Sequence, residues 1–574
     1  MAITTSFILN WLSSLETRDL IRHALFGLAY LVIVDIVWRI IYYRYFHPLR
    51  HYPGPWLASI TRLWLAWHHF RGTELQTQWM LIKKHGKKSI PTILSQGPVI
   101  RVTPTMLLIA DSKAMPVVFH RRDTKSRFYL QGYVGKSNSI LLREPGAHAA
   151  HRRLIGAPYA LANIQKMEPL LDKHILHWIS SIDERFVGQQ KPVDFSHWSH
   201  YLAYDTITDL GFRNPLGFIK SGSDVGGLIE GFRVGMLIFG VAGRIYPLTE
   251  MLLNSWLKKW LVVRTEQKLG FAVVMEKAGA ILAERSRRIK EHGDRARKGE
   301  KAYDLLQSFM DARTPDGDHL ADDTIISEIF VILGAGSDRF GSASTAFMVS
   351  ILSQPAIFRR LMDEIEDAIA AGKLSYPVPT YTEVSRHLPF YAACIKEALR
   401  LNPSGATLLP RVVCPGDPDL IVNGRQVPVD TEVAMNPWIA HRDKNLYGED
   451  AEEFYPDRWL GDPAAAKVYE KYNLAWGYGA RVCLGKPFAM MELYKGPLSL
   501  LLNFDVTLAE VGPDTPAPHS EMYATVKVWG DVWLQLQRSH RWSDMGTKMA
   551  QNKLADGKRN EEVAGGVPLP EDLQ

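Results

Sequence analysis

A glycine-rich turn around one cysteine constrains this chain more than any other feature of its sequence. Near the carboxyl end the chain reads Trp476-Gly-Tyr-Gly-Ala-Arg-Val-Cys-Leu-Gly485. Its three glycines allow the backbone to turn sharply around Cys483 and to approach a flat ligand closely. The following run to Lys495 has helical spacing, and a helix amino terminus favours a thiolate over a thiol. Arg481 adds positive charge, so we expect an anionic sulfur here.

Composition and charge narrow the class of protein. The chain has 574 residues, of which 46% are hydrophobic and 22% charged, as in a globular protein with a large core. Three cysteines (Cys394, Cys414 and Cys483) provide no disulfide framework and indicate a reducing compartment. The net charge of +6 is slight at this length, so we predict no nucleic-acid partner.

An apolar segment near the amino terminus predicts a membrane anchor. Residues Ala24 to Tyr43 are about as long as a helix needs to cross hydrocarbon. Asp35 and Arg39 interrupt the segment, but their spacing of four lets them pair on one helix face. The alternatives to a transmembrane helix over 24–43 are a buried core helix and a helix lying at the membrane interface.

The charges beside this segment predict its orientation and the layout of the chain. Arg39, Arg44 and Arg50 lie on its carboxyl side, so the rest of the chain is expected in the cytosol and residues 1–23 in the lumen. Three prolines make residues 44–58 a stiff hinge. One folded body is expected over 59–544, and the polar residues 545–574 are predicted to be a disordered tail.

The cysteine segment resembles the haem-binding signature of the cytochrome P450 family, F-x-x-G-x-R-x-C-x-G. Gly479, Arg481, Cys483 and Gly485 meet its fixed positions, and Trp476 takes the place of phenylalanine. The resemblance implies the family's fold, mainly α-helical with small β-sheets, as the catalytic domain over 59–544. It also implies haem b as cofactor, with Cys483 as the axial ligand of the iron and with Trp476, Arg481 and Gly485 beside the haem.

Further motifs follow the family's order. Glu397 and Arg400 match its E-x-x-R, and their spacing of three puts both on one helix face, as in many surface pairs. By resemblance, Arg458 in the segment FYPDRW completes a buried network that holds the chain before Cys483. Loss of one member of such a network would leave a buried charge without its partner.

Three cationic or imidazole side chains resemble the family's contacts to the haem propionates. His148 and Arg152 match an H-x-x-x-R helix, and Arg411 follows Pro410 where many members direct an arginine at a propionate. A guanidinium suits this task because it binds both oxygens of a carboxylate. Taken one by one, each arginine could instead be solvated.

A long apolar run from Asp323 to Ser353 predicts a helix of roughly 45 Å that crosses the haem face. Asp338 and Arg339 at its centre argue against a second membrane span. The family pattern here is [AG]-G-x-[DE]-T. The chain retains Gly336, which by resemblance forms the oxygen-side groove, and Asp338, which would act in proton delivery.

Arg339 stands where the family pattern has threonine, so the usual alcohol is missing. A substrate hydroxyl, ordered water or Ser337 could replace it. We hypothesise that Arg339 alters proton delivery or binds an anionic group of the substrate. The alternative is that Arg339 points away into a salt bridge while water fills the gap.

The resemblance also suggests a lipophilic substrate pocket. The candidate lining residues are Phe128, Tyr129, Tyr133, the segment 236–248, Leu333, Ala335, Thr407, Leu408, Met522 and Tyr523. Most of these side chains are apolar, which suits a lipophilic small molecule.

The expected function is therefore oxidation of a lipophilic small molecule by a haem-thiolate monooxygenase. The closest family resemblance is to microsomal fungal members that tailor secondary metabolites, which implies the endoplasmic reticulum membrane. No flavin or nicotinamide domain is evident, so NADPH electrons would come from a separate cytochrome P450 reductase, with cytochrome b5 as a further candidate partner. Two alternatives remain open: a haem-thiolate isomerase, cyclase or dehydratase, and a catalytically silent haem-binding membrane protein.

Overall fold

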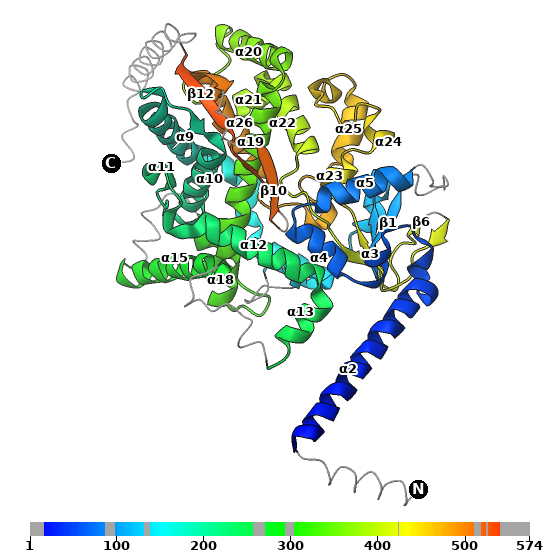
Figure 1. Ribbon diagram of the computed structural model, residues 1–574. Coiled ribbons are helices and arrows are strands. Elements are labelled where there is room, and N and C mark those ends of the chain that lie inside the picture. Colours follow the sequence, from blue (N-terminus) through cyan, green and yellow to red (C-terminus); the bar gives the residue numbers. More distant parts are fainter. Residues whose placement is uncertain are drawn as a thin grey trace, which may run out of the picture.

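The protein is a helix-rich body with small sheets and one projecting amino-terminal helix (Figure 1). The computed structural model describes residues 17–86, 98–130, 138–256, 270–292, 304–422, 424–509, 518–523 and 526–539. The predicted mainly α-helical fold with small β-sheets is confirmed. The predicted lumenal residues up to 16 and the predicted tail over 545–574 lie outside the described residues.

Helices form most of the body. The longer ones are α2 (Thr17–Ile41), α5 (Glu74–Gly86), α7 (Pro145–Ile155), α9 (Glu168–Ile182), α10 (Phe195–Phe212), α12 (Leu228–Arg244), α15 (Phe271–His292), α18 (Asp322–Val331), α19 (Ser337–Leu352), α20 (Pro355–Ala370), α22 (Pro389–Leu401) and α26 (Lys486–Asn503). The shorter ones are α3 (Trp56–Ile60), α4 (Leu63–Phe70), α6 (Met115–Val118), α8 (Leu161–Lys166), α11 (Phe218–Ser221), α13 (Tyr246–Leu253), α17 (Leu305–Asp311), α21 (Tyr381–His387), α23 (Pro437–Ala440), α24 (Lys444–Tyr447) and α25 (Pro463–Lys471).

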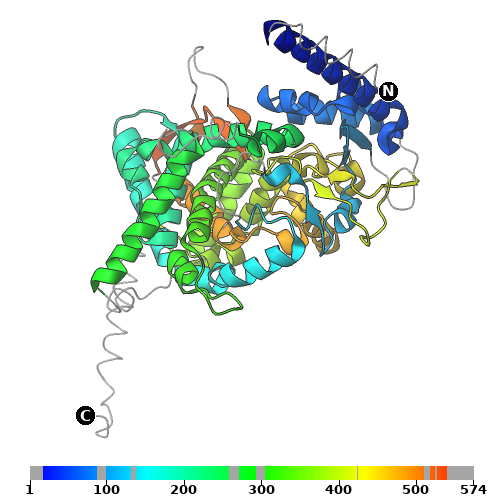
Figure 2. The same ribbon diagram turned by 90° about the horizontal axis from the view of Figure 1, so that it is seen from below.

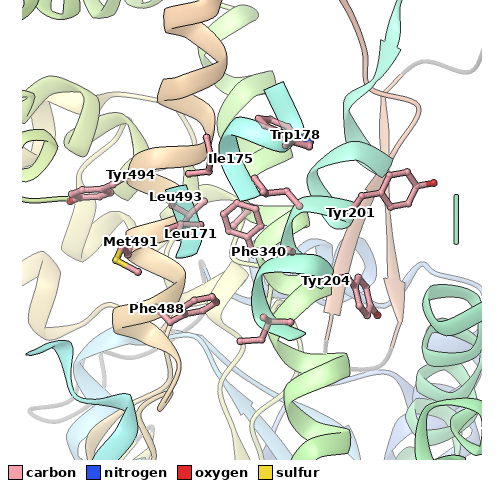
Figure 3. Packing of buried hydrophobic residues seen from close by; sticks show 14 of the residues in the cluster. Leu171, Ile175, Trp178, Tyr201, Tyr204, Phe340, Phe488, Met491, Leu493 and Tyr494 are labelled. Carbon is pink, nitrogen blue, oxygen red and sulfur yellow. The ribbon is translucent and has the colours of Figure 1, made fainter. Parts of the chain in front are cut away.

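The main core lies where α9, α10, α19 and α26 pack together. α10 begins where the Asp194 carboxylate accepts the His197 N–H, and nearly all of its side chains are buried, as in a core helix. Figure 3 shows Phe340 of α19 between side chains of α26, such as Leu493, and the neighbouring helices. This packing fixes the position of α19 relative to the start of α26, which follows Cys483.

The predicted long helix over 323–353 is present, with a local change of pitch. α18 runs into a π-helical turn, η9 (Ile332–Gly336), and then into α19. Single π turns occur inside helices mainly at functional sites, because the wider turn frees backbone groups from the usual pairing. The turn ends at Gly336, two residues before Asp338.

In the part of the chain that the structure describes, four small sheets complete the body. A five-stranded sheet has the order β1 (Val99–Thr103), β2 (Met106–Ile109), β8 (Glu432–Ala434), β5 (Arg411–Val412) and β3 (Thr124–Lys125). The others pair β4 (Val193–Asp194), β12 (Trp533–Arg538) and β9 (Phe504–Leu508); β10 (His519–Tyr523) and β11 (Val526–Gly530); and β6 (Ile421–Val422) and β7 (Arg425–Gln426). In the first sheet, β2 and β8 are parallel, and the antiparallel pairing of β3 with β5 sets Lys125 opposite Arg411.

The amino-terminal helix α2 extends from the side of the body that holds α4 and α5 (Figure 2). Its predicted Asp35–Arg39 pair is present at 2.5 Å. Leu25–Phe46 has a mean hydropathy of 1.9 and none of it is buried, which is compatible with a membrane anchor. Among the described residues, Val225–Arg244 is also long and apolar enough to span a membrane, but 44% of it is buried in the body.

The proline-rich segment after the anchor packs onto the five-stranded sheet. Leu49 and Tyr52 share a core cluster with residues of β1 and β2. The backbone N–H of Arg101 on β1 donates to the Pro53 carbonyl at 2.7 Å. The Arg101 side chain reaches the Tyr43 carbonyl at 3.1 Å. These contacts tie the end of the anchor to the body.

Candidate active site

Two glycines in the left-handed backbone conformation form the turn of the cysteine loop, residues 476–485. Gly477 and Gly479 have φ values of 78° and 57°, which residues other than glycine rarely adopt. The Cys483 N–H donates to the Trp476 carbonyl at 2.7 Å and closes the loop. α26 begins three residues after the cysteine, and it continues to Asn503, beyond the end expected at Lys495. The sulfur therefore lies close to the amino terminus of α26.

Cys483 lines a cavity of about 380 Å³. Trp476 and Gly485 line the same cavity beside it. The long helix supplies a further wall through Gly336 and Arg339. The predicted proximal cysteine and the predicted distal helix therefore share one cavity.

Besides Arg339, four cationic side chains line this cavity: Lys125, Arg152, Arg411 and Arg481. The Asp123 carboxylate accepts from both Arg411 and Arg481, the latter at 2.8 Å. Burial, together with the three arginines, holds the pKa of Lys125 well below its usual value, and Asp123 opposes this shift. Positive charge thus exceeds negative charge around Lys125.

This surplus of positive charge fits a ligand that carries carboxylate groups. Buried like charges are unfavourable unless an opposite charge accompanies them. A haem group would bring two propionates to the cations and an iron to the Cys483 sulfur, so the donor set fits haem at both ends. Lys125 and Asp123 escaped the sequence analysis, because only the pairing of β3 with β5 and the ion pairs to Asp123 bring them to Arg411.

His148 and Arg152, the two predicted site residues of α7, make different contacts. Arg152 donates to the carbonyls of Val482 at 2.6 Å and Ala480 at 3.2 Å, so it braces the cysteine loop directly. His148 is buried and lines the cavity. Burial lowers the pKa of His148 to about 3, which leaves its ring neutral at neutral pH.

The predicted Glu397–Arg400–Arg458 network is assembled and buried. Arg400 and Glu397 pair at 2.8 Å with both side chains fully buried. Arg458 donates to Glu397 at 3.4 Å and pairs with Asp450 at 2.9 Å. The indole N–H of Trp459 adds a bond to Glu397 at 2.9 Å.

A histidine links this network to the cysteine loop. Arg400 donates to the His441 carbonyl at 2.5 Å, and the His441 Nδ1 is 2.9 Å from the Arg400 carbonyl. Burial lowers the pKa of His441 to about 3, so its neutral ring donates from Nδ1 and accepts at Nε2. Nε2 accepts the Leu474 N–H at 2.8 Å, two residues before Trp476. The sequence analysis missed His441.

Replacing Glu397 tests how much this network stabilises the body. We expect Glu397→Gln to lower the free energy of unfolding by about 3–5 kcal/mol, because it leaves two buried guanidiniums without their shared carboxylate. Urea denaturation of the full chain in detergent measures the change. The control is Lys396→Ala, which removes a half-exposed pair with Glu470 at 2.8 Å. This control should lower the free energy of unfolding by less than about 1 kcal/mol. Equal losses in the two variants would contradict the stabilising role assigned to the Glu397 network.

The distal helix turns its two central charged residues in different directions. Arg339 lines the cavity. Burial lowers the pKa of Arg339, and the nearby Cys483 thiolate opposes that shift. Asp338 is buried and does not line the cavity; its Oδ1 lies 3.7 Å from Nε2 of His200 on α10. Burial raises the pKa of Asp338 to about 6.

The predicted substrate-pocket residues divide into two groups. Tyr129, Ala335 and Thr407 line the cavity, as do Met236 and Phe239 of the predicted segment 236–248. The expectation is wrong for Phe128, Leu333, Leu408, Met522 and Tyr523, which do not line it, and Tyr133 lies outside the described residues. Apolar lining residues that the sequence analysis missed are Ile207, Leu210, Phe232, Phe271, Phe330, Ile332 and Val526.

Comparisons with known proteins agree with this geometry. The family model described as Cytochrome P450 matches residues 61–528. The chain is 52% identical over 517 residues to "Quiannulatic acid synthase" of Emericella variicolor, covering 90% of this chain and 95% of the relative. It is 31% identical over 478 residues to "Cytochrome P450 monooxygenase gsfF" of Penicillium aethiopicum, covering 82% and 90% of the two chains.

Proposed function

Because this chain belongs to the cytochrome P450 family, we propose that it oxidises a lipophilic small molecule with dioxygen and electrons from a separate NADPH-dependent reductase. It is a cytochrome P450 monooxygenase of the kind found in fungal secondary-metabolite pathways. The observation that carries the proposal is the Cys483 sulfur in a cavity whose cations exceed their carboxylate partners. When bound there, a haem with an axial thiolate supplies dioxygen activation.

Different residues of the chain would ligate the iron, bind the propionates and bind the substrate. Cys483 would ligate the iron, and Lys125, Arg411 and Arg481 would bind the propionates. Arg152 braces the cysteine loop through its bonds to the Val482 and Ala480 carbonyls. Apolar side chains of the cavity would bind the substrate and exclude water.

Cys483→Ala tests the haem assignment. We expect the full-length parent to give the reduced-CO difference spectrum that thiolate-ligated haem produces in this family, and the variant to lose it. Cys414→Ala should keep the spectrum, because this half-buried thiol contacts the Val412 carbonyl and does not line the cavity. A parent without the spectrum, or a Cys483 variant that retains it, would refute the proposal.

A basic hollow beside the cysteine loop supports an acidic electron donor. The hollow measures about 310 Å³, and its lining includes Arg121, Arg152, Arg153 and Arg481. Arg121 and Arg153 are exposed, so their charges are available to a partner. Such surfaces accelerate encounter with an oppositely charged protein. This supports docking of a reductase, and of cytochrome b5, at this face.

Turnover with purified reductase tests the electron source. We expect NADPH- and dioxygen-dependent gain of oxygen by a substrate, detected by mass analysis after pathway intermediates are supplied. Arg153→Glu should slow reductase-dependent reduction about ten-fold at low salt, and the difference should shrink at high salt. Lys373→Glu, an exposed lysine outside the hollow, is the control. Product formed without NADPH would instead support an isomerase, cyclase or dehydratase.

Arg339 would bind an anionic group of the substrate. Its side chain lines the cavity with Cys483, and its backbone carbonyl accepts from the Ser404 hydroxyl at 2.9 Å. The 52%-identical relative is named as a synthase of an acid. An acidic substrate or product would pair with the guanidinium through charge-assisted hydrogen bonds.

Arg339→Thr tests this role with ligands of known charge. The ferric protein is titrated optically with dodecanoic acid and with its methyl ester. We expect the variant to lose about ten-fold of its affinity for the acid and to bind the ester unchanged, because only the acid carries the charge. Product formed per NADPH consumed is compared in parallel. Identical affinities and identical coupling would leave Arg339 without a part in binding or catalysis. Arg360→Thr, an exposed arginine paired with Asp457, is the control.

The anchor and its surroundings support a place on the endoplasmic reticulum membrane with the body in the cytosol. α2 carries exposed apolar side chains along its length. Exposed side chains of α3 and α4, among them Trp56, Trp67 and Phe70, add apolar surface to the body. Arginines follow the anchor, which favours the cytosol for its carboxyl side.

A further inference from the structure

A cluster of four phenylalanine rings forms one wall of the cavity. Phe232 and Phe239 come from α12, Phe271 from α15 and Phe330 from α18, and all four line the cavity. Phe271 lies at the centre of this phenylalanine cluster, with ring centroids 5.0 Å from Phe330, 5.8 Å from Phe232 and 6.5 Å from Phe239. Because α15 packs against both α12 and α18, the wall combines side chains of three helices (Figure 1).

The wall that carries this cluster is suited to hydrocarbon. Among the cavity-lining residues that α12, α15 and α18 supply in the described chain, the charged one is Glu328. Its carboxylate accepts the Ser139 N–H at 2.7 Å and the Ser139 hydroxyl at 3.0 Å, and it lies 2.7 Å from Nε2 of His151. Because the protein itself satisfies this carboxylate, the wall favours an apolar part of a ligand.

Two glycines let rings of the cluster lie back from the cavity. A Cβ atom at Gly235 of α12 would lie within 3.0 Å of three ring carbons of Phe271. A Cβ atom at Gly334 of η9 would likewise lie within 3.0 Å of three ring carbons of Phe232. Neither glycine lines the cavity. Each ring therefore occupies the space that the side chain of any other residue would fill.

A methyl group added at either glycine would push a ring toward the cavity. Where α12 meets the start of α15, a Cβ atom at Gly231 would lie 3.1 Å from the Gly270 carbonyl oxygen, so these helices are already in close contact. Arg244 at the end of α12 pairs with Glu74 of α5 at 2.6 Å, and both side chains are buried. Breaking this pair to move α12 would leave a buried charge without its partner. The cavity is the space that remains, because packed interiors hold few other voids.

The cluster lies along the distal helix from the sulfur. Phe330 and Arg339 both line the cavity and are nine positions apart on the continuous run of α18, η9 and α19, which corresponds to about 13 Å. The Cys483 charge acts on Arg339, so Arg339 lies toward the sulfur. A substrate that reaches both places therefore presents its body, and not its reacting carbon, to the phenylalanine cluster.

We propose that Gly235 and Gly334 are specificity-determining residues, which hold the phenylalanine cluster back so that the cavity accepts a hydrocarbon body wider than an alkyl chain. This rests on the proposed monooxygenase function and narrows its substrate class. Rings from three helices form a surface several rings across, whereas an extended alkyl chain covers little more than one ring. A broad alicyclic body buries more apolar area against the cluster, and the free energy of burial grows with that area.

Two carboxylic acids of different width test this proposal in the full-length protein. Dodecanoic acid has a linear chain and abietic acid has three fused rings, and each carries one carboxylate, so a difference between them reports on the hydrocarbon body. We expect the parent to bind abietic acid more tightly. Gly235→Ala and Gly334→Ala should each lose about ten-fold of the affinity for abietic acid, as one methyl group does in an apolar pocket, and should change the affinity for dodecanoic acid less than about two-fold.

A third glycine provides the matched control. Gly279 lies on α15, and a Cβ atom there would meet no atom within 4 Å. Gly279→Ala should therefore bind both acids as the parent does.

Second substitutions separate a displaced ring from a damaged fold. Phe271→Leu is combined with Gly235→Ala, and Phe232→Leu is combined with Gly334→Ala. Each double variant should recover affinity for abietic acid, because the smaller side chain leaves room for the added methyl group.

Binding is measured by the absorbance of the ferric haem and, independently, by equilibrium dialysis. A parent without preference for abietic acid, unchanged affinities in the glycine variants, or an equal loss for both acids would overturn the proposal. So would an equal loss in Gly279→Ala, or double variants that recover no affinity. Absence of NADPH-dependent oxidation in the parent would refute the proposed function and leave the dialysis comparison intact.

Discussion

The buried Glu397–Arg400 pair is linked through His441 to the loop that carries the Cys483 sulfur. Arg400 uses its remaining N–H groups on backbone carbonyls, including that of His441, and the His441 ring accepts the N–H of Leu474 just before the cysteine loop. Every link in this chain is buried and short, so the loop can shift only by leaving polar groups unpaired. A metal ligand needs such a support, because its position must persist whether or not the metal is bound.

Electrostatics and shape around the cavity favour the same cofactor. Lys125 and Arg411 face each other across a strand pair, and Arg481 shares the Asp123 carboxylate with Arg411. Asp123 offsets only part of the repulsion among these charges, whereas much of the remaining cavity lining is apolar. A flat ligand with carboxylates at one edge and a metal at its centre satisfies both conditions. The remaining apolar space suits a lipophilic substrate.

The distal helix directs two neighbouring charged residues, Asp338 and Arg339, to different surroundings. The π turn over Ile332–Gly336 precedes an arginine that lines the cavity and an acid that faces α10. The proposed binding of an anion by Arg339 would act at the cavity, while Asp338 lies on the side of the helix that faces α10. A substrate that becomes more acidic on oxidation would gain affinity for Arg339, while Asp338 and His200 remain buried behind it.

Short stretches of sequence were enough to predict the anchor helix, its Asp35–Arg39 pair, the cysteine loop and the long distal helix, since each depends on residues within a few turns of one another. The Glu397–Arg400 spacing was equally local, but its burial required the surrounding fold. Lys125 and Asp123 carried no local signal. Neither did His200, because strand pairing and helix packing bring these groups together from distant segments. Tertiary structure also decided which face Asp338 and Arg339 present, since neighbouring residues on a helix point about 100° apart and only the packed partners determine which one meets the cavity.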